Sequence, residues 1–599
     1  MTDRQPLSLD YLLSIPRIGA YTVAPRGGRV AVQWDRDGKW DLFLLDGAGA
    51  EPERLTGGGE AALDPNWDPS GERLAFVSDR AGNENFDIFV LRPGAGAPVK
   101  VTSGGSDHHA PTWSPDGRHL AFTSNRGGDL NLFVMAADGT DVRAITTGEV
   151  PVGRAQWSRC GGALLYTRGM RECEVWLKPL DERPTKRLLG RPDTEFEVDD
   201  GCWLPDGSGF YFISNENDVF DIGLYRMAGG ALERVVTSPY EKESPCVSPD
   251  GARLAYLEHR DGNVLLRLRD LRTSDDRLVS PEPGVADSPT WDADGNLYFL
   301  HSSARRPNDL WVFTSDGALR QLTNSLPADF PTDAVPEPTV ARFPSFDGRD
   351  ITALVTTPRT PSAVALVDIH GGPESHEVNT WDPVRHFLVQ AGYVVIAPNY
   401  RGSTGFGRKF LRLADFDLGG GDLRDVVAAA DYLIAQGLAR PDHIGVFGGS
   451  YGGYLTMMAL TQYPDRWAAG ATLVGFFNWV TEFETEREYL KFYDSQKVGT
   501  PTSHPDFYFE RSPINFADRV RCPLLILHGE QDPRCPVTEA RQLAATLEQQ
   551  GTPFSFATYP DEGHGFRKRT NRIDAWTRVR DFFGAHLPIG VATGVAAER

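Results

Sequence analysis

The segment 443–453 contains the residues of this chain that are best suited to chemistry. It reads His-Ile-Gly-Val-Phe-Gly-Gly-Ser-Tyr-Gly-Gly, so an apolar run ends in a Gly-x-Ser-x-Gly pattern around Ser450, and a helix-like stretch, 454–463, follows. The pattern is typical of a strand that turns sharply into a helix with a nucleophilic serine at its tip. Glycines suit so tight a turn because side chains would not fit there. A purely structural glycine turn is the alternative.

A serine nucleophile needs a base, which in this arrangement follows both the serine and an acid along the chain. Of the 13 histidines, only His564 and His586 lie beyond every plausible acid. His564 occupies a glycine-bracketed loop after the strand-like residues 554–558, whereas His586 ends an amphipathic segment, 573–587, where histidine more often caps a helix. His564 is therefore the predicted base.

The acid is expected at the end of another strand. Residues 523–529 read as a buried parallel strand, and Glu530-Gln531-Asp532-Pro533 turns after it. We predict Asp532 as the acid, with Glu530 as the second choice. Its carboxylate would hold the imidazole in one tautomer and stabilise the cation without taking the proton. Asp561, on the same loop as the predicted base, is expected to cap a turn instead.

A third apolar strand, 363–369, leads into His-Gly-Gly-Pro at 370–373. Such a loop can place a backbone N–H beside the serine, where it would complement the N–H of Tyr451 in an oxyanion hole. Gly372 is the predicted donor because Pro373 fixes the chain just beyond it. A plain glycine turn is again the alternative.

The N-terminal half is a repeat. Seven anchors are spaced 44, 46, 44, 46, 44 and 44 residues apart, and each is followed by short apolar strands and a polar turn. Four short strands in about 45 residues is the period of a β-propeller blade, so the pattern predicts a seven-bladed all-β propeller over residues 16–325, in preference to an array of sandwiches. The anchors begin at Val23 (degenerate), Trp67, Trp113, Trp157, Trp203, Val247 and Trp291.

At 599 residues the chain is too long for one core, and we expect two domains. Residues 326–338 contain four prolines and form the predicted linker. Strand-like and helical runs alternate over residues 339–599, which indicates an α/β-hydrolase fold with a mostly parallel sheet. Residues 1–15 are expected to pack on this second domain. Because both propeller ends are tied to it, the turns between the middle strands of the blades should face it.

Composition limits the function classes. The net charge of −21 and the pI near 5.1 disfavour nucleic-acid binding. No signal peptide or long apolar run is evident, so we expect a cytoplasmic protein without membrane contact. No cofactor or metal is predicted, since the adjacent His108 and His109 point apart on an extended chain. Six cysteines are not a disulfide framework, although a bridge between Cys202 and Cys246 is left open.

A propeller followed by such a hydrolase resembles the prolyl oligopeptidase family of serine peptidases. The His-Gly-Gly-Pro form and the Ser-Pro-Asp-Gly-type blades are most similar to its acylaminoacyl peptidase branch. The motifs that carry the resemblance are 370–373 (His-Gly-Gly-Pro), 399–403 (Asn-Tyr-Arg-Gly-Ser), 448–454, 528–534 (His-Gly-Glu-Gln-Asp-Pro-Arg) and 563–566 (Gly-His-Gly-Phe).

The resemblance implies substrate contacts. Arg534 would bind a backbone carbonyl of the substrate, and Phe476 and Trp479 would line the pocket for the residue at the cut, although core packing is the alternative for both. Dipeptidyl peptidases of the family carry a paired glutamate that grips a free amino terminus. This propeller has no clear Glu-Glu pair, which disfavours strict dipeptidyl specificity.

The sequence thus predicts a serine peptidase that acts on short peptides and releases an N-terminal acylated or free residue. The alternatives are a dipeptidyl- or carboxy-terminal-specific exopeptidase of the same family, a small-molecule esterase or amidase, and a non-enzymatic docking scaffold with a relic hydrolase. Oligopeptides are the expected partners, and homo-oligomerisation is left open.

Overall fold

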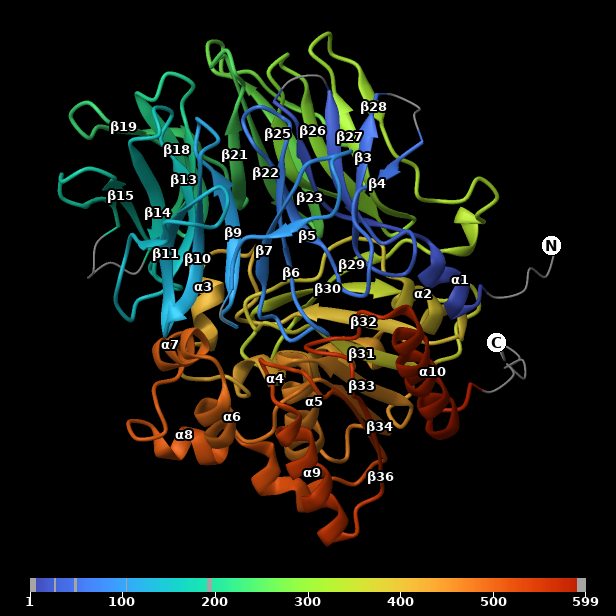
Figure 1. Ribbon diagram of the computed structural model, residues 1–599. Coiled ribbons are helices and arrows are strands. Elements are labelled where there is room, and N and C mark those ends of the chain that lie inside the picture. The colour runs from blue at the N-terminus through green and yellow to red at the C-terminus, as the bar shows by residue number, and fades with distance from the viewer. Residues whose placement is uncertain (1–6, 26–27, 48–50, 104, 191–195, 590–599) are drawn as a thin grey trace.

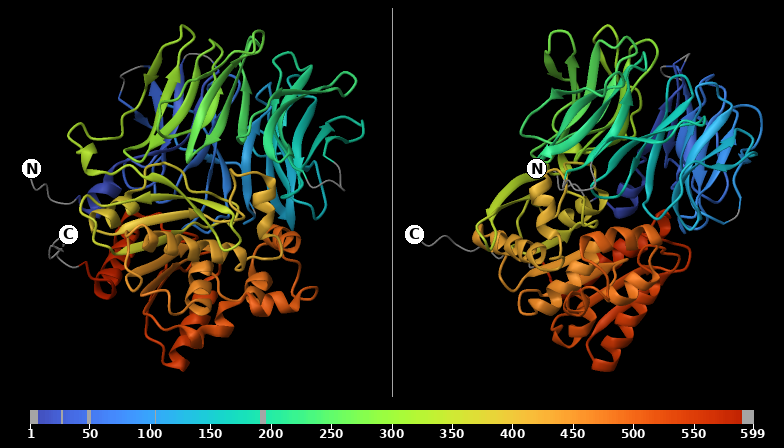
Figure 2. Two further views of the ribbon diagram at one scale, coloured as in Figure 1. Left: turned by 180° about the vertical axis from the view of Figure 1, so that it is seen from behind. Right: turned by 90° about the vertical axis from the view of Figure 1, so that its left-hand side faces the viewer.

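The chain forms a β-propeller stacked on an α/β domain (Figure 1). The computed structural model describes residues 7–25, 28–47, 51–103, 105–190 and 196–589. Figure 2 shows the two parts as superposed layers, with the propeller strands on one side and the helices around the second sheet on the other. The fold class expected from the sequence is therefore the one observed.

In its described residues, the propeller consists of seven four-stranded blades, each antiparallel and contiguous in sequence, and one parallel bridge between Val264 and Val285 joins the last two blades into one sheet. Blades 1 and 2 hold β1 (Ile18–Val23), β2 (Arg29–Trp34), β3 (Asp41–Asp46), β4 (Glu53–Arg54), β5 (Leu63–Trp67), β6 (Leu74–Ser78), β7 (Asp87–Leu91) and β8 (Val99–Lys100). Blades 3 and 4 hold β9 (His108–Trp113), β10 (His119–Gly127), β11 (Asp129–Ala136), β12 (Arg143–Ala144), β13 (Val152–Trp157), β14 (Ala163–Arg168), β15 (Glu174–Pro179) and β16 (Lys186–Leu189).

The remaining three blades follow the same pattern. Blade 5 holds β17 (Val198–Trp203), β18 (Gly209–Asn217), β19 (Val219–Arg226) and β20 (Leu232–Val236). Blades 6 and 7 hold β21 (Lys242–Val247), β22 (Arg253–Arg260), β23 (Asn263–Asp270), β24 (Asp276–Leu278), β25 (Val285–Trp291), β26 (Leu297–Ser303), β27 (Arg306–Phe313) and β28 (Leu319–Gln321).

The repeated anchors join neighbouring blades. The indole of Trp113 donates a hydrogen bond to the Asn66 carbonyl of the preceding blade at 3.0 Å. Trp157 makes the equivalent bond to Thr112, also at 3.0 Å. Trp291 donates in the same way to the Cys246 carbonyl of blade 6 at 3.1 Å, so these three anchors bury apolar area while their one polar atom is satisfied by the neighbour. The indole nitrogens of Trp67 and Trp203 are buried without a hydrogen-bond partner among the described residues, so these two anchors contribute by packing.

Blade 1 and blade 7 meet without exchanging a strand. Among the described residues β1 pairs only with β2, and no ladder crosses to blade 7. The two blades are held by apolar packing, in which Val32 and Trp34 lie against Leu300 and Leu310. The ring is thus closed by side chains.

The turns between the middle strands of the blades face the second domain, as expected. In blade 5, the Asp218 carbonyl accepts a hydrogen bond from Arg408 N at 2.7 Å. In blade 6, Asp261 pairs with Arg342 at 2.6 Å. In blade 4, Arg171 binds Asp415 at 2.7 Å. Ion pairs and hydrogen bonds from several blades therefore attach the propeller to the second domain.

The second domain is built on one sheet with the order β29-β30-β32-β31-β33-β34-β35-β36. From β32 onward the neighbours are parallel, whereas β29, β30 and β32 pair antiparallel. The strands are β29 (Thr339–Pro344), β30 (Asp350–Thr356), β31 (Ala365–Ile369), β32 (Val394–Asn399), β33 (Ile444–Gly449), β34 (Ala469–Leu473), β35 (Leu524–Gly529) and β36 (Phe554–Tyr559).

Helices cover both faces of this sheet. One face packs on α2 (Pro383–Gln390) and α10 (Arg569–His586), and the other on α4 (Gly421–Ala435), α5 (Tyr451–Gln462) and α9 (Val537–Gln550). The parallel strands are almost wholly apolar because both faces are covered. The smaller helices are α3 (Arg408–Leu411), α6 (Trp479–Thr485), α7 (Glu488–Lys497), α8 (Pro505–Glu510), η2 (Arg412–Ala414) and η3 (Pro513–Arg519).

Helix α1 (Leu9–Ser14) joins the N-terminus to the second domain. Its Leu12 is fully buried with Phe330, Trp381 and Phe387, next to η1 (Thr332–Ala334). Within the described residues, none of the helices combines the length and the apolar character needed to span a bilayer. None of the six cysteines, all of which lie in the described residues, forms a disulfide, so Cys202 and Cys246 are not bridged.

Candidate active site

Strand β33 ends at Gly449, and α5 begins at once with Tyr451, three residues earlier than the sequence pattern indicated. Ser450 stands between them with φ 57° and ψ −125°. A non-glycine residue in this conformation is strained, and such strain is typical of functional turns. At Gly452 a Cβ would lie 2.0 Å from the carbonyl oxygen of Ile369, so only glycine fits there. The turn raises Ser450 above the sheet at the N-terminus of a helix.

Ser450, His564 and Asp532 form one hydrogen-bonded chain. The Oγ of Ser450 lies 2.9 Å from Nε2 of His564. Nδ1 of His564 lies 3.0 Å and 2.9 Å from the two carboxylate oxygens of Asp532. An ionised carboxylate only accepts hydrogen bonds, so Nδ1 carries the proton and Nε2 is free to accept one from the serine.

The carboxylate of Asp532 is held by its own loop. It accepts hydrogen bonds from the backbone N–H of Arg534 at 2.9 Å and of Cys535 at 3.0 Å. Burial would raise the pKa of Asp532, but hydrogen bonds from His528 and His564 outweigh it and keep the pKa well below its usual range. The carboxyl group is therefore ionised at neutral pH and stabilises a positive imidazole.

The alternative acids of this region have other partners. Glu530 accepts from Thr558 at 2.7 Å and pairs with Arg541 at 3.1 Å. Asp561 forms an ion pair with Lys568 on its own loop. Neither carboxylate contacts His564, so the structure brings together the three residues predicted first.

The His-Gly-Gly-Pro loop passes directly beside the serine. A Cβ on Gly371 would lie 3.2 Å from the Cβ of Ser450, so the backbone approaches as closely as glycine allows. Gly372 adopts φ 125°, which disfavours any other residue. Tyr451 occupies the first turn of α5, where backbone N–H groups have no partner within the helix. Tyr451 thus follows Ser450 directly, and Gly371 is the loop residue seen beside the serine. The role of Gly372 as an oxyanion donor stays a prediction.

The predicted substrate residues are in two different settings. Arg534 lies two residues beyond Asp532, and half of its side chain is exposed, with Nε bound to Glu84 of the propeller at 2.8 Å. Phe476 and Trp479 are 6% and 2% exposed and pack on Tyr454 in the core. Arg534 is therefore accessible to a ligand. Phe476 and Trp479 pack in the core, which was the alternative given for these two residues. A role for them as pocket walls stays a prediction.

Sequence reasoning missed the contribution of blade 2. The turn after β6 carries Asp79 and Glu84, which are both buried. Asp79 binds Arg567, three residues beyond His564, at 3.0 Å. Glu84 binds Arg534. The carboxylates occur in a turn whose composition resembles that of other blades, so no local signal could have distinguished them.

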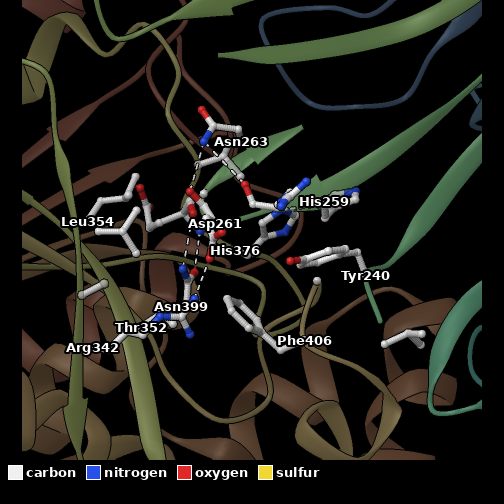
Figure 3. A pocket seen from close by; sticks show the side chains of 18 of the residues that line it. Tyr240, His259, Asp261, Asn263, Arg342, Thr352, Leu354, His376, Asn399 and Phe406 are labelled. Atoms are coloured by element: carbon white, nitrogen blue, oxygen red, sulfur yellow. Dashed lines mark hydrogen bonds and ion pairs between the residues drawn. The ribbon is translucent and has the colours of Figure 1, made fainter. Parts of the chain in front are cut away.

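A cavity of about 240 Å³ lies elsewhere along the domain boundary (Figure 3). It is lined by Tyr240, His259 and Phe406, together with residues of β29 and β30. At its edge Nδ1 of His259 lies 3.1 Å from Nε2 of His376. None of the three residues of the hydrogen-bonded chain lines this cavity, so it is separate from the reactive serine. Within the described part of the chain, no cluster of His, Cys, Asp or Glu is arranged to hold a metal ion.

Comparison with known proteins agrees with this geometry. Residues 380–589 match the prolyl oligopeptidase family, and residues 82–189 match the TolB beta propeller domain. Residues 380–589 form a prolyl oligopeptidase family domain. This family domain includes Ser450, Asp532 and His564, and the motif loop at 370–373 lies just before it.

Two curated relatives illustrate the range of similar proteins. Dipeptidyl aminopeptidase BIII of Pseudoxanthomonas mexicana is 30% identical over 343 residues, covering 53% of this chain and 50% of the relative. Acylamino-acid-releasing enzyme 1 of Oryza sativa subsp. japonica is 30% identical over 231 residues, covering 37% and 30%. The chain thus matches half or less of the length of these relatives.

A puromycin-hydrolyzing peptidase of Mycobacterium tuberculosis has a similar solved structure. The two superpose with a TM-score of 0.88 at 22% identity, over 98% of this chain and 97% of the other. The whole two-domain architecture, and with it the position of the propeller over the prolyl oligopeptidase family domain, is therefore shared.

Proposed function

We propose that the protein is a serine peptidase that cleaves short peptides through an acyl-enzyme intermediate. One observation carries the proposal: Ser450 Oγ, the imidazole of His564 and the carboxylate of Asp532 are joined by hydrogen bonds of 2.9 to 3.0 Å. Such a chain activates a serine toward an acyl carbon.

In the first step the Oγ of Ser450 attacks the scissile carbonyl carbon and its proton passes to Nε2 of His564. The carbonyl oxygen takes up negative charge, which the N–H groups of Gly372 and Tyr451 would stabilise together with the N-terminus of α5. Collapse of this intermediate expels the amine, which takes the proton from His564. Water then repeats the sequence, releases the acid and restores the serine.

The proposed substrates are oligopeptides from which an N-terminal acylated or free residue is released. The prolyl oligopeptidase family domain supports peptide substrates, and relatives named for acylamino acid release and for dipeptidyl aminopeptidase activity support action near an amino terminus. The proposal includes a cytoplasmic location, which is consistent with the six described cysteines forming no disulfide.

The test is a comparison of wild type with Ser450→Ala. We expect the wild type to react with a fluorophosphonate at Ser450 and to release p-nitroaniline from blocked or unblocked aminoacyl anilides. The variant should do neither, while its melting temperature stays within a few degrees of wild type. Full turnover by the serine variant would refute the proposal.

A small-molecule esterase is the second candidate, favoured only by the half-exposed side chain of Arg534, two residues beyond Asp532, which is accessible to a small anionic ester. Turnover of a nitrophenyl ester with no cleavage of any anilide would support it. Failure of the fluorophosphonate to label Ser450 would instead favour a scaffold role without chemistry.

A further inference from the structure

Three carboxyl groups are buried in and around α6 and α7, the helical insertion between β34 and β35 (Figure 1). Glu482, Glu486 and Asp494 are 4%, 6% and 9% exposed. Glu486 lies one turn beyond Glu482, and its backbone N–H donates to the Glu482 carbonyl at 2.9 Å. Residues four apart on a helical turn share one face, so the first two carboxyl groups project to the same side.

The basic residues of this insertion bind other acids. Among the described residues, Glu482, Glu486 and Asp494 have no basic side chain within 4 Å, since none of them takes part in an ion pair. The basic residues of α7 and its start have closer acidic partners: Arg487 binds Asp107 at 2.9 Å, Lys491 binds Glu488 at 2.8 Å, and Lys497 binds Glu374 at 2.8 Å. Lys491 and Lys497 favour the ionised forms of Glu486 and Asp494 only through longer-range attraction.

Two of the carboxylate oxygens have no hydrogen-bond partner within the described chain. They are Oε2 of Glu482 and Oε1 of Glu486, and both are shielded from solvent. Burial, reinforced by Asp494, raises the pKa of Glu486 to about 10. An unpaired buried carboxyl group costs folding free energy, on the order of several kcal/mol when ionised. Apolar packing therefore does not explain why two such carboxyl groups are buried side by side.

The cluster adjoins the reactive residues. Glu482 follows Trp479 by one turn of α6. Burial raises the pKa of Glu482 well above its usual range, and acidic side chains around it, which include Glu539 and Asp532, add to the effect. Burial, followed by the nearby carboxyl groups of Glu482 and Asp532, raises the pKa of the Cys535 thiol well above its usual range, so Glu482 lies close to the loop of Asp532. Glu482 thus lies between the predicted pocket residue Trp479 and the loop of the acid, and Glu486 follows it by one turn.

We infer that Glu482 and Glu486 form the anionic end of a substrate subsite that takes a cationic group, an ammonium or a guanidinium. The cation would supply the hydrogen-bond donors and the positive charge that these two carboxyl groups lack in the described structure. It can come from the side chain of the residue at the cut or from the free amino terminus of a short peptide. This inference rests on the proposed peptidase function and specifies its substrate class.

Four p-nitroanilides separate the two sources: acetyl-lysyl, acetyl-norleucyl, lysyl and norleucyl. Norleucine matches the length of lysine without its charge, and acetylation removes the terminal cation. We expect kcat/KM of wild type to favour a cationic substrate by roughly 10-fold or more over its neutral counterpart. The Glu482→Gln and Glu486→Gln variants should lose that preference and keep their activity on acetyl-norleucyl anilide. Loss confined to the lysyl side chain identifies a basic residue at the cut, and loss confined to the unblocked substrates identifies the amino terminus.

Glu484→Gln is the matched control, because Glu484 is on the same helix but exposed. It should leave all four rates unchanged. A wild type indifferent to both charges, or glutamine variants that lower all four rates equally, would overturn the inference while leaving the peptidase proposal intact. If no anilide is cleaved and the fluorophosphonate does not label Ser450, both proposals fail together.

Discussion

Glu84 of the propeller lies 2.8 Å from Nε of Arg534, two residues beyond Asp532. A carboxylate from blade 2 therefore orients a side chain of the acid loop, and Asp79 from the same turn binds Arg567 on the histidine loop. Arg487, between α6 and α7, donates to the Asn83 carbonyl at 2.9 Å. A single propeller turn thus contacts the loop of Asp532, the loop of His564 and the residue that precedes α7.

The role of Glu84 can be measured. Glu84→Gln keeps the shape of the side chain and removes the charge that holds Arg534. We expect kcat/KM for a short peptide anilide to fall roughly 10-fold, because small displacements of positioning groups are costly. The control is Glu72→Gln, also in blade 2, whose exposed side chain pairs with Arg92. Equal rates in both variants would show that the propeller carboxylate does not orient Arg534.

Gly563 gives a steric prediction. A Cβ at this position would lie 2.0 Å from the carbonyl oxygen of Gly82 in blade 2. Gly563→Ala should displace the neighbouring His564 and lower kcat by about 100-fold, with little change in KM. Gly584→Ala on α10 is the matched control, since a Cβ there meets nothing within 4 Å. A fully active Gly563→Ala enzyme would show that the contact yields without moving the histidine.

Asp532 is expected to be essential and Glu530 dispensable. Asp532→Asn removes the charge that fixes the tautomer of His564, and the rate should fall on the order of 10⁴. Glu530→Gln, two residues away, should retain most of the activity because Glu530 binds Thr558 and Arg541. Steady-state kinetics on one anilide decide between the two carboxylates, and the opposite ranking would reassign the acid.

Glu482 makes stability depend on pH in a predictable direction. Burial raises its pKa in the folded protein, so above the unfolded pKa the folded state retains a proton that the unfolded state has lost. Its unfavourable contribution is therefore absent near pH 4 and grows as the pH rises. Glu482→Gln should melt a few degrees above wild type at pH 8 and at nearly the same temperature at pH 4. A constant difference across this range would contradict the raised pKa.

The elbow and the blades were predictable because local geometry fixes them. Gly452 and the conformation of Ser450 belong to a turn whose residues lie next to each other in sequence. The anchor tryptophans recur because each ends the first strand of its blade, and three of them, Trp113, Trp157 and Trp291, donate in the same way to the preceding blade. Local chemistry of this kind leaves a pattern in the sequence.

The contacts between domains could not be predicted. Arg534 carried an expected role, but its partner Glu84 lies 450 positions away and differs in no local feature from other turn residues. The unpaired oxygen of Glu482 was equally hidden, because the sequence does not show which side chains the fold packs around it. Such arrangements depend on docking between distant segments.

The seam between blade 1 and blade 7 determines what holds the ring shut. No β-ladder crosses it in the described chain, and Val32 and Leu300 are in contact only through apolar packing. The two ends of the ring are instead attached to the second domain. Helix α1 packs against Trp381 and Phe387, and the chain continues from β28 into β29 of the second sheet. The second domain thus holds both ends of the propeller in place. Closure of the ring and the integrity of the second domain therefore depend on each other.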